Sequence, residues 1–397
     1  MSAVIEPTEP LIRAVLDLRH DLHAHPELAY QERRTSAVVE RELAAAGVES
    51  VAGLAGGTGV LGWLPATDNP ASAPTIALRA DMDALPIHEA TGKPYASQHE
   101  GVMHACGHDG HTSILLGAAR TLAHSTRRPN NVLLLFQPAE EGGAGGQKMV
   151  QNGVLSGKVL GKPADMIFGL HGWTTLPLGK LATRVGPMMA ATNTFEVVLE
   201  GRGGHAAAPH TTRDPIAAAA YLVTALQSLA SRNADPLDSL VVTVGQIDGG
   251  SAVNIIPEFA RIRGTVRTLL PETRATIAQR FREVCEGVAQ AFGMTASIDW
   301  VEGYPVTSNH ATAVGRFMEV VGEELGTDSV SDQGEQTMGG EDFSFYGTEC
   351  PACFFQLGLI PPGEDGYASV HTPQFDFNDD AIPYGIRAMV ALAVRPF

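Results

Sequence analysis

Residues 75–87 read TIALRADMDALPI, an apolar run that ends in two acidic residues. The same design recurs in NNVLLLFQPAEEGGAGG at 130–146 and in ADMIFGLHGW at 164–173. Short continuous apolar runs bounded by turn residues are typical of strands buried on both faces, as in a parallel sheet. A helical pattern, HTSILLGAARTLAHS at 111–125, lies between the first two runs. This alternation of strands and helices predicts an α/β layer fold.

Each of the three apolar runs ends in acidic or imidazole side chains. These are Asp81 and Asp83, Glu140 and Glu141, and His171. Ligands of open α/β sheets bind outside the carboxyl ends of the strands. The sequence therefore predicts that three strands direct metal-type ligands toward one edge of the sheet.

The middle of the chain has a different pattern, in which apolar and polar residues alternate as in a sheet with one solvated face. Strand, helix, strand, strand, helix and strand patterns follow one another at 193–204, 214–232, 239–250, 260–269, 271–292 and 296–304. This order fits a compact two-layer α+β module. We expect this module, at 187–303, to be inserted into a first domain that comprises 1–186 and 304–397.

The composition limits the class of protein and its partners. The chain has 397 residues, of which 44% are hydrophobic, and a formal net charge of −17. A surface this acidic repels phosphate backbones and anionic lipids, which argues against nucleic acid and membrane surfaces as partners. We find no secretory signal and no run of about 18 apolar residues. Four cysteines do not make a disulfide framework, so we expect a cytoplasmic protein.

The segment MHACGHDGHTSILLGAA at 103–119 places Cys106, His108, Asp109 and His111 in one turn before a helix. Thiolate, imidazole and carboxylate groups at such a junction can bind a transition metal, and the helix N-terminus favours their anionic forms. The alternative is a buried cysteine and a capping aspartate beside incidental histidines. The number of histidines in this short stretch favours the metal site.

Glu140 and Glu141 are adjacent carboxylates that follow a buried strand. Such a pair is costly through desolvation and mutual repulsion unless a cation offsets both charges. Neighbouring side chains point in different directions, so one can bind a metal while the other takes a proton from the attacking water. The alternative is an acidic loop with glycines for turning.

Isolated histidines are weaker signals, because a lone histidine more often packs in a core or lies at the surface. We interpret His171 and His371 as metal ligands only because other strand ends already offer donor groups that could share the ion. His23, in LRHDLHAHPEL, is interpreted as a packing and hydrogen-bonding group. Asp81 and Asp83 flank Met82 and project to the same side, where they can orient imidazole ligands or bind metal directly. We favour the orienting role for both.

Nine segments, in order over nearly the whole chain, resemble the aminoacylase–carboxypeptidase family of di-metal peptidases. They are RHDLHAHPEL, RADMDALPI, MHACGHDGHT, QPAEEGGAGG, GLHGW, GRGGHAAAPH, NIIPEFARIRGTVRT, GGEDFSFY and HTPQFDFND. The resemblance is strongest to the branch of hippurate hydrolases and indole-acetyl-amino-acid hydrolases. MHACGHDGHT together with PAEEG is specific to that branch.

The resemblance implies roles for the residues of the first domain, with Glu140 as the general base. The implied metal ligands are Cys106, His108, Glu141, His171 and His371. Distant relatives place a histidine and an aspartate where this chain has Asp81 and Cys106, but the branch with ACGHD uses the thiolate. Asp81 therefore receives a supporting role beside the ligands. The same supporting role is expected of Asp83, Asp109 and Glu341.

The resemblance also makes the inserted module a lid and dimerisation domain. His205 matches a histidine that stabilises the oxyanion, often across a dimer. Asn254 and Arg267 match residues that hold the substrate's carboxylate, Arg267 by a two-pronged contact. We expect a homodimer, and we expect lid closure to bring all three residues to the metals.

The expected activity is metal-dependent hydrolysis of the amide bond of N-acyl amino acids, with an acetyl, benzoyl or indole-acetyl group as the acyl part. The expected cofactors are two divalent ions per subunit, for which zinc, manganese, cobalt and nickel all suit the ligands. A dipeptidase or carboxypeptidase, or a deacetylase of a biosynthetic acetyl-amino acid, is the first alternative. A non-catalytic metal-binding relative is the second, and the presence of Glu140 argues against it.

Overall fold

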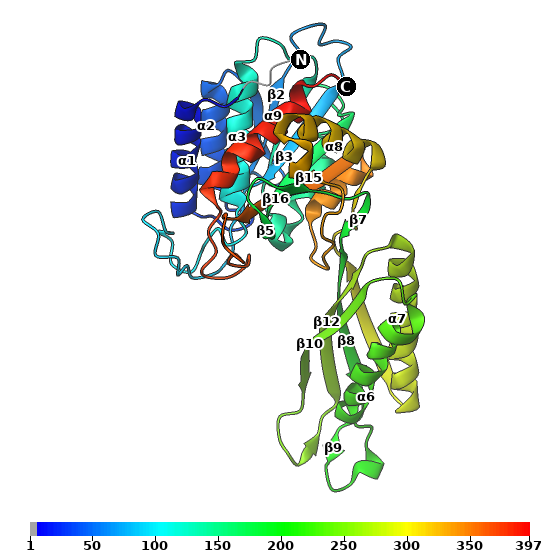
Figure 1. Cartoon of the computed structure of the whole chain (residues 1–397). Helices are drawn as coiled ribbons and strands as arrows, with labels where there is room; N and C mark the ends of the chain where they lie inside the picture. The colour runs from blue at the N-terminus through cyan, green and yellow to red at the C-terminus, as the bar shows by residue number, and fades with distance from the viewer. Residues whose placement is uncertain (1–5) are drawn as a thin grey trace. The chain divides into compact units, whose positions relative to one another are not determined.

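The computed structural model describes residues 6–397, which form two compact units (Figure 1). Unit 1 runs to Met188 and also includes Ser308–Glu335 and Asp342–Phe397. Unit 2 comprises Met189–Thr307 and Gln336–Glu341. The chain enters unit 2 after Met188 and again after Glu335, and it returns to unit 1 after Thr307 and after Glu341.

One segment differs from the domain division expected from the sequence. Residues 336–341 belong to unit 2, although the sequence pattern places them in the first domain. Backbone pairing explains the difference, since the Ala190 amide donates to the Gly339 carbonyl at 2.8 Å. The Thr307 hydroxyl also donates to the Glu341 carbonyl at 3.1 Å. Such pairing between distant segments leaves no periodic signal in the sequence.

Unit 1 is built on an eight-stranded sheet with the order β1-β2-β4-β3-β5-β16-β6-β15. The strands are β1 (Glu49–Leu54), β2 (Gly59–Leu64), β3 (Thr75–Asp81), β4 (Asn131–Gln137), β5 (Met166–Pro177), β6 (Leu181–Ala182), β15 (Val330–Ser331) and β16 (Ala352–Ile360). The central strands β4, β3, β5 and β16 are parallel to one another. Every residue of β3 and β4 is buried, as a parallel centre requires. The predicted α/β fold with a mostly parallel centre is confirmed.

Helices cover this sheet, and α1, α3 and α9 lie side by side in Figure 1, with α8 packed against α9. The helices of unit 1 are α1 (Glu9–Ala24), α2 (Arg33–Ala45), α3 (His108–Ala123), α4 (Glu140–Gly143), α5 (Gly145–Asn152), α8 (Ala311–Leu325) and α9 (Ile382–Val394). Short helical turns are η3 (Thr327–Ser329), η4 (Asp342–Thr348) and η5 (Asp379–Ala381). Helix α3 is buried almost throughout, so its N-terminus is held firmly in the core.

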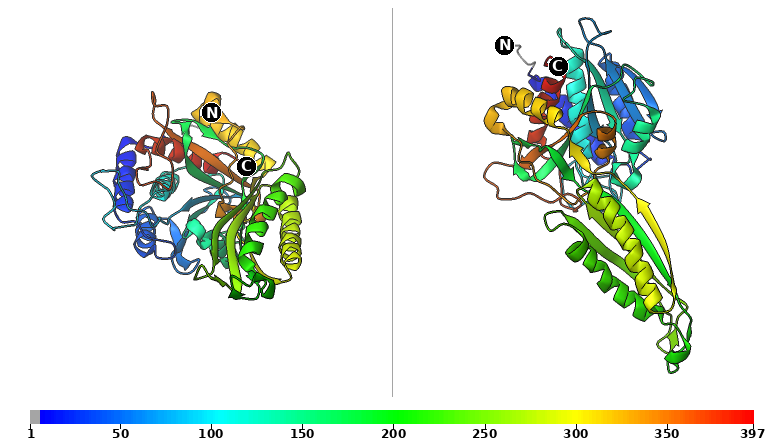
Figure 2. Two further views of the ribbon diagram at one scale, coloured as in Figure 1. Left: turned by 90° about the horizontal axis from the view of Figure 1, so that it is seen from below. Right: turned by 90° about the vertical axis from the view of Figure 1, so that its right-hand side faces the viewer.

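Unit 2 is an antiparallel four-stranded sheet with the order β10-β12-β8-β13, and two helices pack against one face (Figure 2). Its strands and helices are β8 (Ala191–Glu200), α6 (Pro215–Ser228), β10 (Leu240–Gly249), β12 (Phe259–Thr268), α7 (Pro271–Ala291) and β13 (Thr295–Glu302). Its shorter elements are β9 (Gly204–His205), η1 (Pro209–Thr211), η2 (Leu229–Asn233) and β11 (Ile255–Ile256). Strands β7 (Gly186–Met189) and β14 (Thr307–Asn309) pair with each other where the chain passes between the units. Strand β8 alternates buried and accessible residues, as a sheet with one covered face requires.

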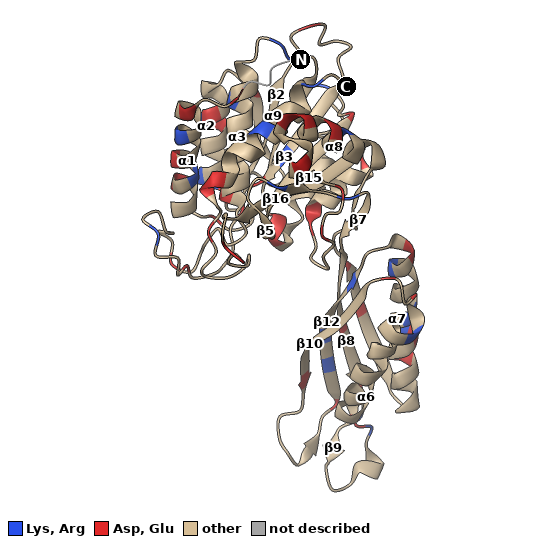
Figure 3. Ribbon diagram, viewed as in Figure 1, with Lys and Arg blue, Asp and Glu red and all other residues tan. Residues whose placement is uncertain are grey.

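Charged residues of both signs occur along the exposed helix α7, whereas β12 carries Arg261, Arg263 and Arg267 (Figure 3). Within residues 6–397 we find no helix with the length and apolar character that crossing a bilayer demands.

Candidate metal centre and active site

Six side chains with metal-type donor atoms gather in unit 1 beside the carboxyl ends of the central strands. Of the five donor groups in the described residues, three are made up of these side chains alone, each with its members within 4.8 Å of one another. The groups are Cys106, His108 and His171; Cys106, Glu141 and His371; and His108, Glu140 and Glu141. The structure thus brings together all five residues expected as metal ligands and the expected general base.

Sheet register explains part of this gathering. Strands β3 and β5 are parallel with Arg79 opposite Gly169, so Asp81 and His171 reach the same level of the sheet. Cys106 ends the loop before α3, and His108 is the first residue of that helix. Between them Gly107 adopts a φ of +85°, where a side chain would meet the ring of Phe377 at 2.8 Å. Glycine is therefore required for the tight approach that sets Cys106 and His108 side by side.

His371 reaches the cluster from a loop rather than from a strand. Its backbone lies in the left-handed region with a φ of +62°, which is costly for a residue with a side chain. The His371 amide donates to the Ala105 carbonyl at 2.7 Å, which ties this loop to the residue before Cys106. The His371 ring is half exposed, and its Nε2 lies 3.1 Å from Glu141 Oε1. His371 therefore forms the accessible side of the cluster.

His108 and His171 each donate through Nδ1 to a backbone carbonyl and direct Nε2 toward the cluster. His108 Nδ1 lies 2.8 Å from the Asp83 carbonyl oxygen and donates to it. The buried His108 Nε2 has no hydrogen-bond partner among residues 6–397. His171 Nδ1 donates to the Gly172 carbonyl at 2.8 Å, and its Nε2 faces Cys106 Sγ at 3.3 Å. A buried ring nitrogen without a hydrogen-bond partner is costly, and a metal ion bound to neutral His108 would supply that partner.

The electrostatics of the cluster also fit a cation. Burial lowers the pKa of His171 to about 3, with the neighbouring His111 adding to the effect, so the ring is neutral and able to bind metal. Burial, together with the charge of Glu141, raises the pKa of the Cys106 thiol. A divalent ion would reverse that shift by stabilising the thiolate. The donor set therefore fits a transition metal.

Glu140 and Glu141 are positioned through their backbone. Asp83 Oδ1 accepts from the Glu140 amide, and Asp83 Oδ2 accepts from the Glu141 amide, both at 2.9 Å. The Asp342 amide donates to Glu140 Oε1 at a longer 3.4 Å. One carboxylate thus fixes both members of the pair, while the carbonyl of the same residue orients His108. This is the supporting position that the sequence suggested for Asp83.

Asp81 orients His111, a histidine that is not among the five expected metal ligands. Its Oδ1 accepts from His111 Nδ1 at 2.7 Å, and its Oδ2 accepts from Arg79 Nη1 at 2.6 Å. His111 Nε2 in turn accepts from the Gly172 amide at 2.9 Å, next to His171. Burial opposes ionisation of Asp81, but the charges of His108 and Arg79 outweigh it and hold its pKa well below the usual range.

Asp109 belongs to a different cluster, which ties α1 to the first turn of α3. Its Oδ2 accepts from His23 Nδ1 at 2.9 Å and from the buried Arg19 at 3.3 Å. Burial alone would lower the pKa of His23, but the charge and hydrogen bond of Asp109 raise it to about 9. Arg19 also contacts Asp376 at 2.8 Å in the loop after His371. Asp109 therefore braces the helix that carries His108.

The remaining expected residues lie in unit 2. His205 and Asn254 are exposed and adjacent, because β9 pairs with β11 and the Ala206 amide donates to the Asn254 carbonyl at 3.1 Å. Arg267 lies at the opposite end of the sheet, eight residues along β12 from Phe259. At roughly 3.3 Å per residue this separates Arg267 from the β9–β11 end by about 26 Å. Glu341 is a buried residue of unit 2.

This separation corrects one expectation from the sequence. We expected lid closure to bring His205, Asn254 and Arg267 to one site. The structure brings His205 and Asn254 together and leaves Arg267 at the other end of a rigid sheet. One copy of unit 2 cannot place all three at the same reaction centre, because a sheet of paired strands does not shorten.

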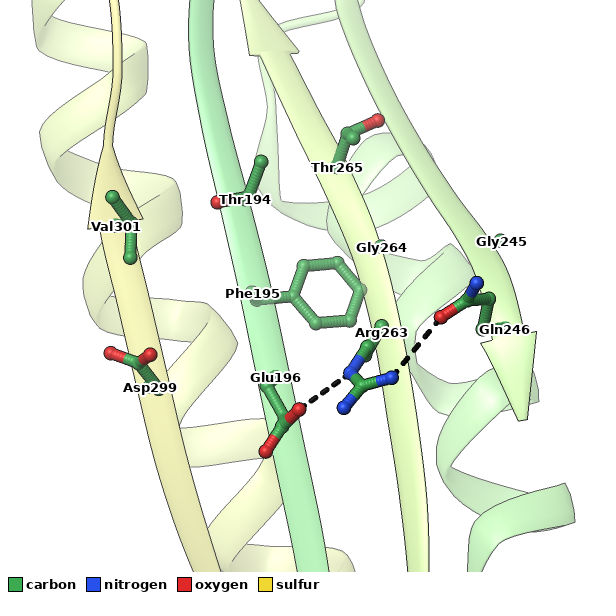
Figure 4. Close-up of a pocket in the computed structure, with 10 residues that line it drawn as sticks. All are labelled: Thr194, Phe195, Glu196, Gly245, Gln246, Arg263, Gly264, Thr265, Asp299 and Val301. Carbon is green, nitrogen blue, oxygen red and sulfur yellow. Dashed lines mark hydrogen bonds and ion pairs between the residues drawn. The ribbon is translucent and has the colours of Figure 1, made fainter. Parts of the chain in front are cut away.

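A cavity of about 390 Å³ on the open face of the unit 2 sheet contains none of the expected residues (Figure 4). Two of its charged members form an ion pair, since Arg263 donates to Glu196 at 2.5 Å, and Arg263 also donates to Gln246 at 3.4 Å. No histidine or cysteine lines this cavity. This cavity therefore lacks the thiolate and imidazole donors that the unit 1 cluster contains.

The sequence interpretation missed the two residues that support Asp81. Arg79 is fully buried and contacts Gln137 and Asp342 as well as Asp81. An arginine inside an otherwise apolar strand was the available signal, because a buried guanidinium requires several acceptors. His111 stood out in the sequence only as one of several histidines. Its role depends on the Gly172 amide, which no spacing rule connects to it.

The fold and the site define a class: a two-unit α/β protein in which thiolate, imidazole and carboxylate donors lie close enough together to hold a metal ion, as in a metal-dependent hydrolase. The model of peptidase family M20/M25/M40 matches residues 77–395, and the chain belongs to this family. The resemblance inferred from the sequence motifs is thus confirmed.

Similar proteins include enzymes named for N-acyl amino acids. The chain is 40% identical over 386 residues to IAA-amino acid hydrolase ILR1-like 2 of Arabidopsis thaliana, covering 96% of this chain and 84% of that one. It is 40% identical over 373 residues to N-acetyl-L-cysteine deacetylase of Bacillus subtilis, covering 94% and 85%. The crystal structure of the Bacillus subtilis YXEP protein, described as a dinuclear metal binding peptidase of family M20, superposes with a TM-score of 0.82, 33% identity and 98% coverage of both chains.

Proposed function

We propose that this protein is a metal-dependent amidohydrolase that cleaves N-acyl amino acids into a carboxylate and a free amino acid. The observation that carries the proposal is the convergence of Cys106, His108, Glu141, His171 and His371 with Glu140 beside them. The names of the relatives agree with this bond type, since both a conjugate hydrolase and an N-acetyl deacetylase act on an acylated amino acid.

We propose that the five clustered residues hold two divalent ions, in keeping with the dinuclear metal binding of the YXEP protein. Cys106 belongs to two of the donor groups, so its thiolate would lie within reach of the partners in both. Bound divalent ions would supply a water of lowered pKa and a polarised amide carbonyl. Zinc, manganese, cobalt and nickel all suit thiolate, imidazole and carboxylate donors.

Glu140 would act as general base and then as general acid. Glu140 is buried, with 7% of the residue exposed, and Asp83 accepts its backbone amide, so its position is fixed. It would take one proton from the attacking water as the oxygen–carbon bond forms. It would return that proton to the leaving nitrogen as the carbon–nitrogen bond breaks, so that the proton count balances.

The unit 2 residues would bind the substrate and the developing negative charge. His205 would donate to the oxyanion of the tetrahedral intermediate, and Asn254 would hold the substrate's carboxylate. Arg267 would pair with that carboxylate through two parallel N–H donors. The separation along β12 supports a homodimer in which His205 and Asn254 serve one centre and Arg267 another.

A panel of N-acyl amino acids tests the proposal directly. The purified protein is assayed with acetyl, benzoyl, indole-acetyl and aminoacyl derivatives of the same amino acid, before and after chelation, and then with single ions restored. We expect hydrolysis of at least one N-acyl amino acid that is lost on chelation and recovered with one or more ions. Equal rates before and after complete chelation would exclude the proposal.

The same panel separates the alternatives. Exclusive cleavage of the aminoacyl derivative would indicate a dipeptidase, whereas exclusive cleavage of the acetyl derivative would indicate a deacetylase. We also propose a cytoplasmic location, which is supported by four cysteines that are all free in the structure.

A further inference from the structure

Glu32 is a fully buried carboxylate to which neither the sequence motifs nor the proposed mechanism gives a role. It precedes helix α2, yet its side chain does not cap that helix. Its Oε1 instead accepts from the Ala139 amide at 2.9 Å and from the Tyr30 amide at 3.0 Å. Its Oε2 accepts from the Thr58 hydroxyl at 2.8 Å. Glu32 thus connects the N-terminal region to the residue before Glu140.

The backbone at Ala139 is costly to hold. Ala139 has a φ of +55° in the left-handed region, which residues with side chains rarely adopt, and it is completely buried. This residue turns the chain from the end of β4 into Glu140. Such a conformation persists only where the surroundings determine it. The Ala139 amide bond to Glu32 is one of those determinants.

The turn is bracketed at both ends by the same N-terminal segment. The Tyr30 hydroxyl donates to the Gly143 carbonyl, while Glu32 holds Ala139 at the other end. Asp83 accepts the Glu140 and Glu141 amides in between. Three consecutive amides are therefore held by two buried carboxylates.

We propose that Glu32 is a positioning residue that, by accepting the Ala139 amide, sets the direction in which the Glu140 carboxylate points. This inference rests on the proposed function of Glu140 and adds to it. The role depends on an acceptor atom at the correct distance. Burial raises the pKa of Glu32 to about 7, in agreement with a group whose acceptor oxygen matters more than its charge.

The test compares two substitutions of Glu32. One removes the charge of the side chain and the other shortens it. Glu32→Gln keeps an oxygen at the same distance, and the Thr58 hydroxyl can turn to accept from the new amide. Glu32→Asp keeps the charge but shortens the side chain by one methylene. We expect kcat to stay within about threefold for Glu32→Gln and to fall about 10- to 100-fold for Glu32→Asp, with KM nearly unchanged.

A matched control removes the other partner of Glu32. Thr58→Val preserves volume and deletes only the bond to Oε2. We expect it to lower the melting temperature but to leave kcat within about threefold of the wild type. If kcat falls in step with the melting temperature across all three variants, Glu32 has only a structural role and the inference is wrong.

A second readout does not depend on activity. Hydrogen exchange of the peptide 137–143 is followed in the metal-free protein and its variants. We expect faster exchange in Glu32→Asp than in Glu32→Gln or Thr58→Val. Unchanged kcat in Glu32→Asp, or a larger loss in Glu32→Gln than in Glu32→Asp, would overturn the inference. A wild-type protein without amidase activity would instead reject the proposed function, while the exchange data would still report on the contact.

Discussion

The candidate functional residues are clustered in unit 1 but lie at two ends of the sheet in unit 2. In unit 1 the candidate ligands are already gathered, three of the five are buried, and Asp83 accepts the amides of Glu140 and Glu141. In unit 2 His205 and Asn254 are exposed, and Arg267 lies at the far end of the sheet. Folding of unit 1 by itself therefore gathers the candidate ligands, whereas folding of unit 2 leaves its candidate residues at two ends of one sheet.

The largest expected effect is at Glu140, in the buried unit. Glu140→Gln should lower kcat by about 10³-fold or more, because the variant cannot take a proton from water. Its metal content, measured by elemental analysis, should stay the same because the ligands are untouched. Glu323→Gln, an exposed residue of the same type in unit 1, is the control. Retained activity in Glu140→Gln would remove the assigned base.

The next largest effect is expected at His205, and it tests whether His205 and Glu140 of one centre come from different subunits. His205→Ala should lower kcat by about 10²-fold through loss of an oxyanion donor. If His205 serves the partner's centre, mixing this variant with Glu140→Gln should restore activity. Random reassociation would give about a quarter of the wild-type rate, because half of the dimers are mixed and each has one intact centre. No recovery after confirmed subunit exchange would place His205 and Glu140 in the same subunit's site.

A smaller effect is expected at Arg267. Arg267→Ala should raise KM about 10- to 100-fold with little change in kcat, because the paired contact to the substrate's carboxylate is present throughout the reaction. The same variant should lose almost nothing on an N-acyl amino acid amide, which lacks that carboxylate. Arg263→Ala, on the same strand, is the control. An equal loss on both substrates would contradict the assigned contact.

The smallest effect concerns the buried cluster that braces α3. The pKa of His23 is raised to about 9, so its charged form stabilises the fold fully below its usual value near 6.5. This stabilisation is lost as pH rises through about 9. The difference in free energy of unfolding between the wild type and His23→Gln should therefore shrink between pH 6.5 and 9 by at most about 3 kcal/mol. Chemical denaturation of the metal-free protein measures it, and a difference independent of pH would contradict the ion pair.

Local sequence patterns predicted the place of a residue in the fold where that place is set by the residue's own strand or helix. The apolar runs that end at Asp81, Glu140 and His171 predicted parallel strands and a shared edge, and the structure has both. The order of strands and helices in the inserted module could also be read from alternation alone. The domain boundary was less exact, because residues 336–341 join unit 2 through backbone pairing.

The functions of supporting residues could not be read in the same way. Asp109 neighbours the metal-site residues in sequence and was expected to support them, yet it bonds to His23 and Arg19. Glu32 carried no signal, because its partner Ala139 lies more than a hundred residues away. Such pairs depend on distances between segments that only the packed core defines.

The sequence by itself determined the types of donor atom, their placement at strand and helix ends, and the acid that stands beside them, because these follow from periodicity and residue chemistry. Only the tertiary structure decided which donors share a space, which residues hold them, and that Arg267 stands apart from His205 and Asn254. The reason is physical: a hydrogen bond or a metal ligand requires a match within fractions of an ångström, and that match arises when distant segments pack together.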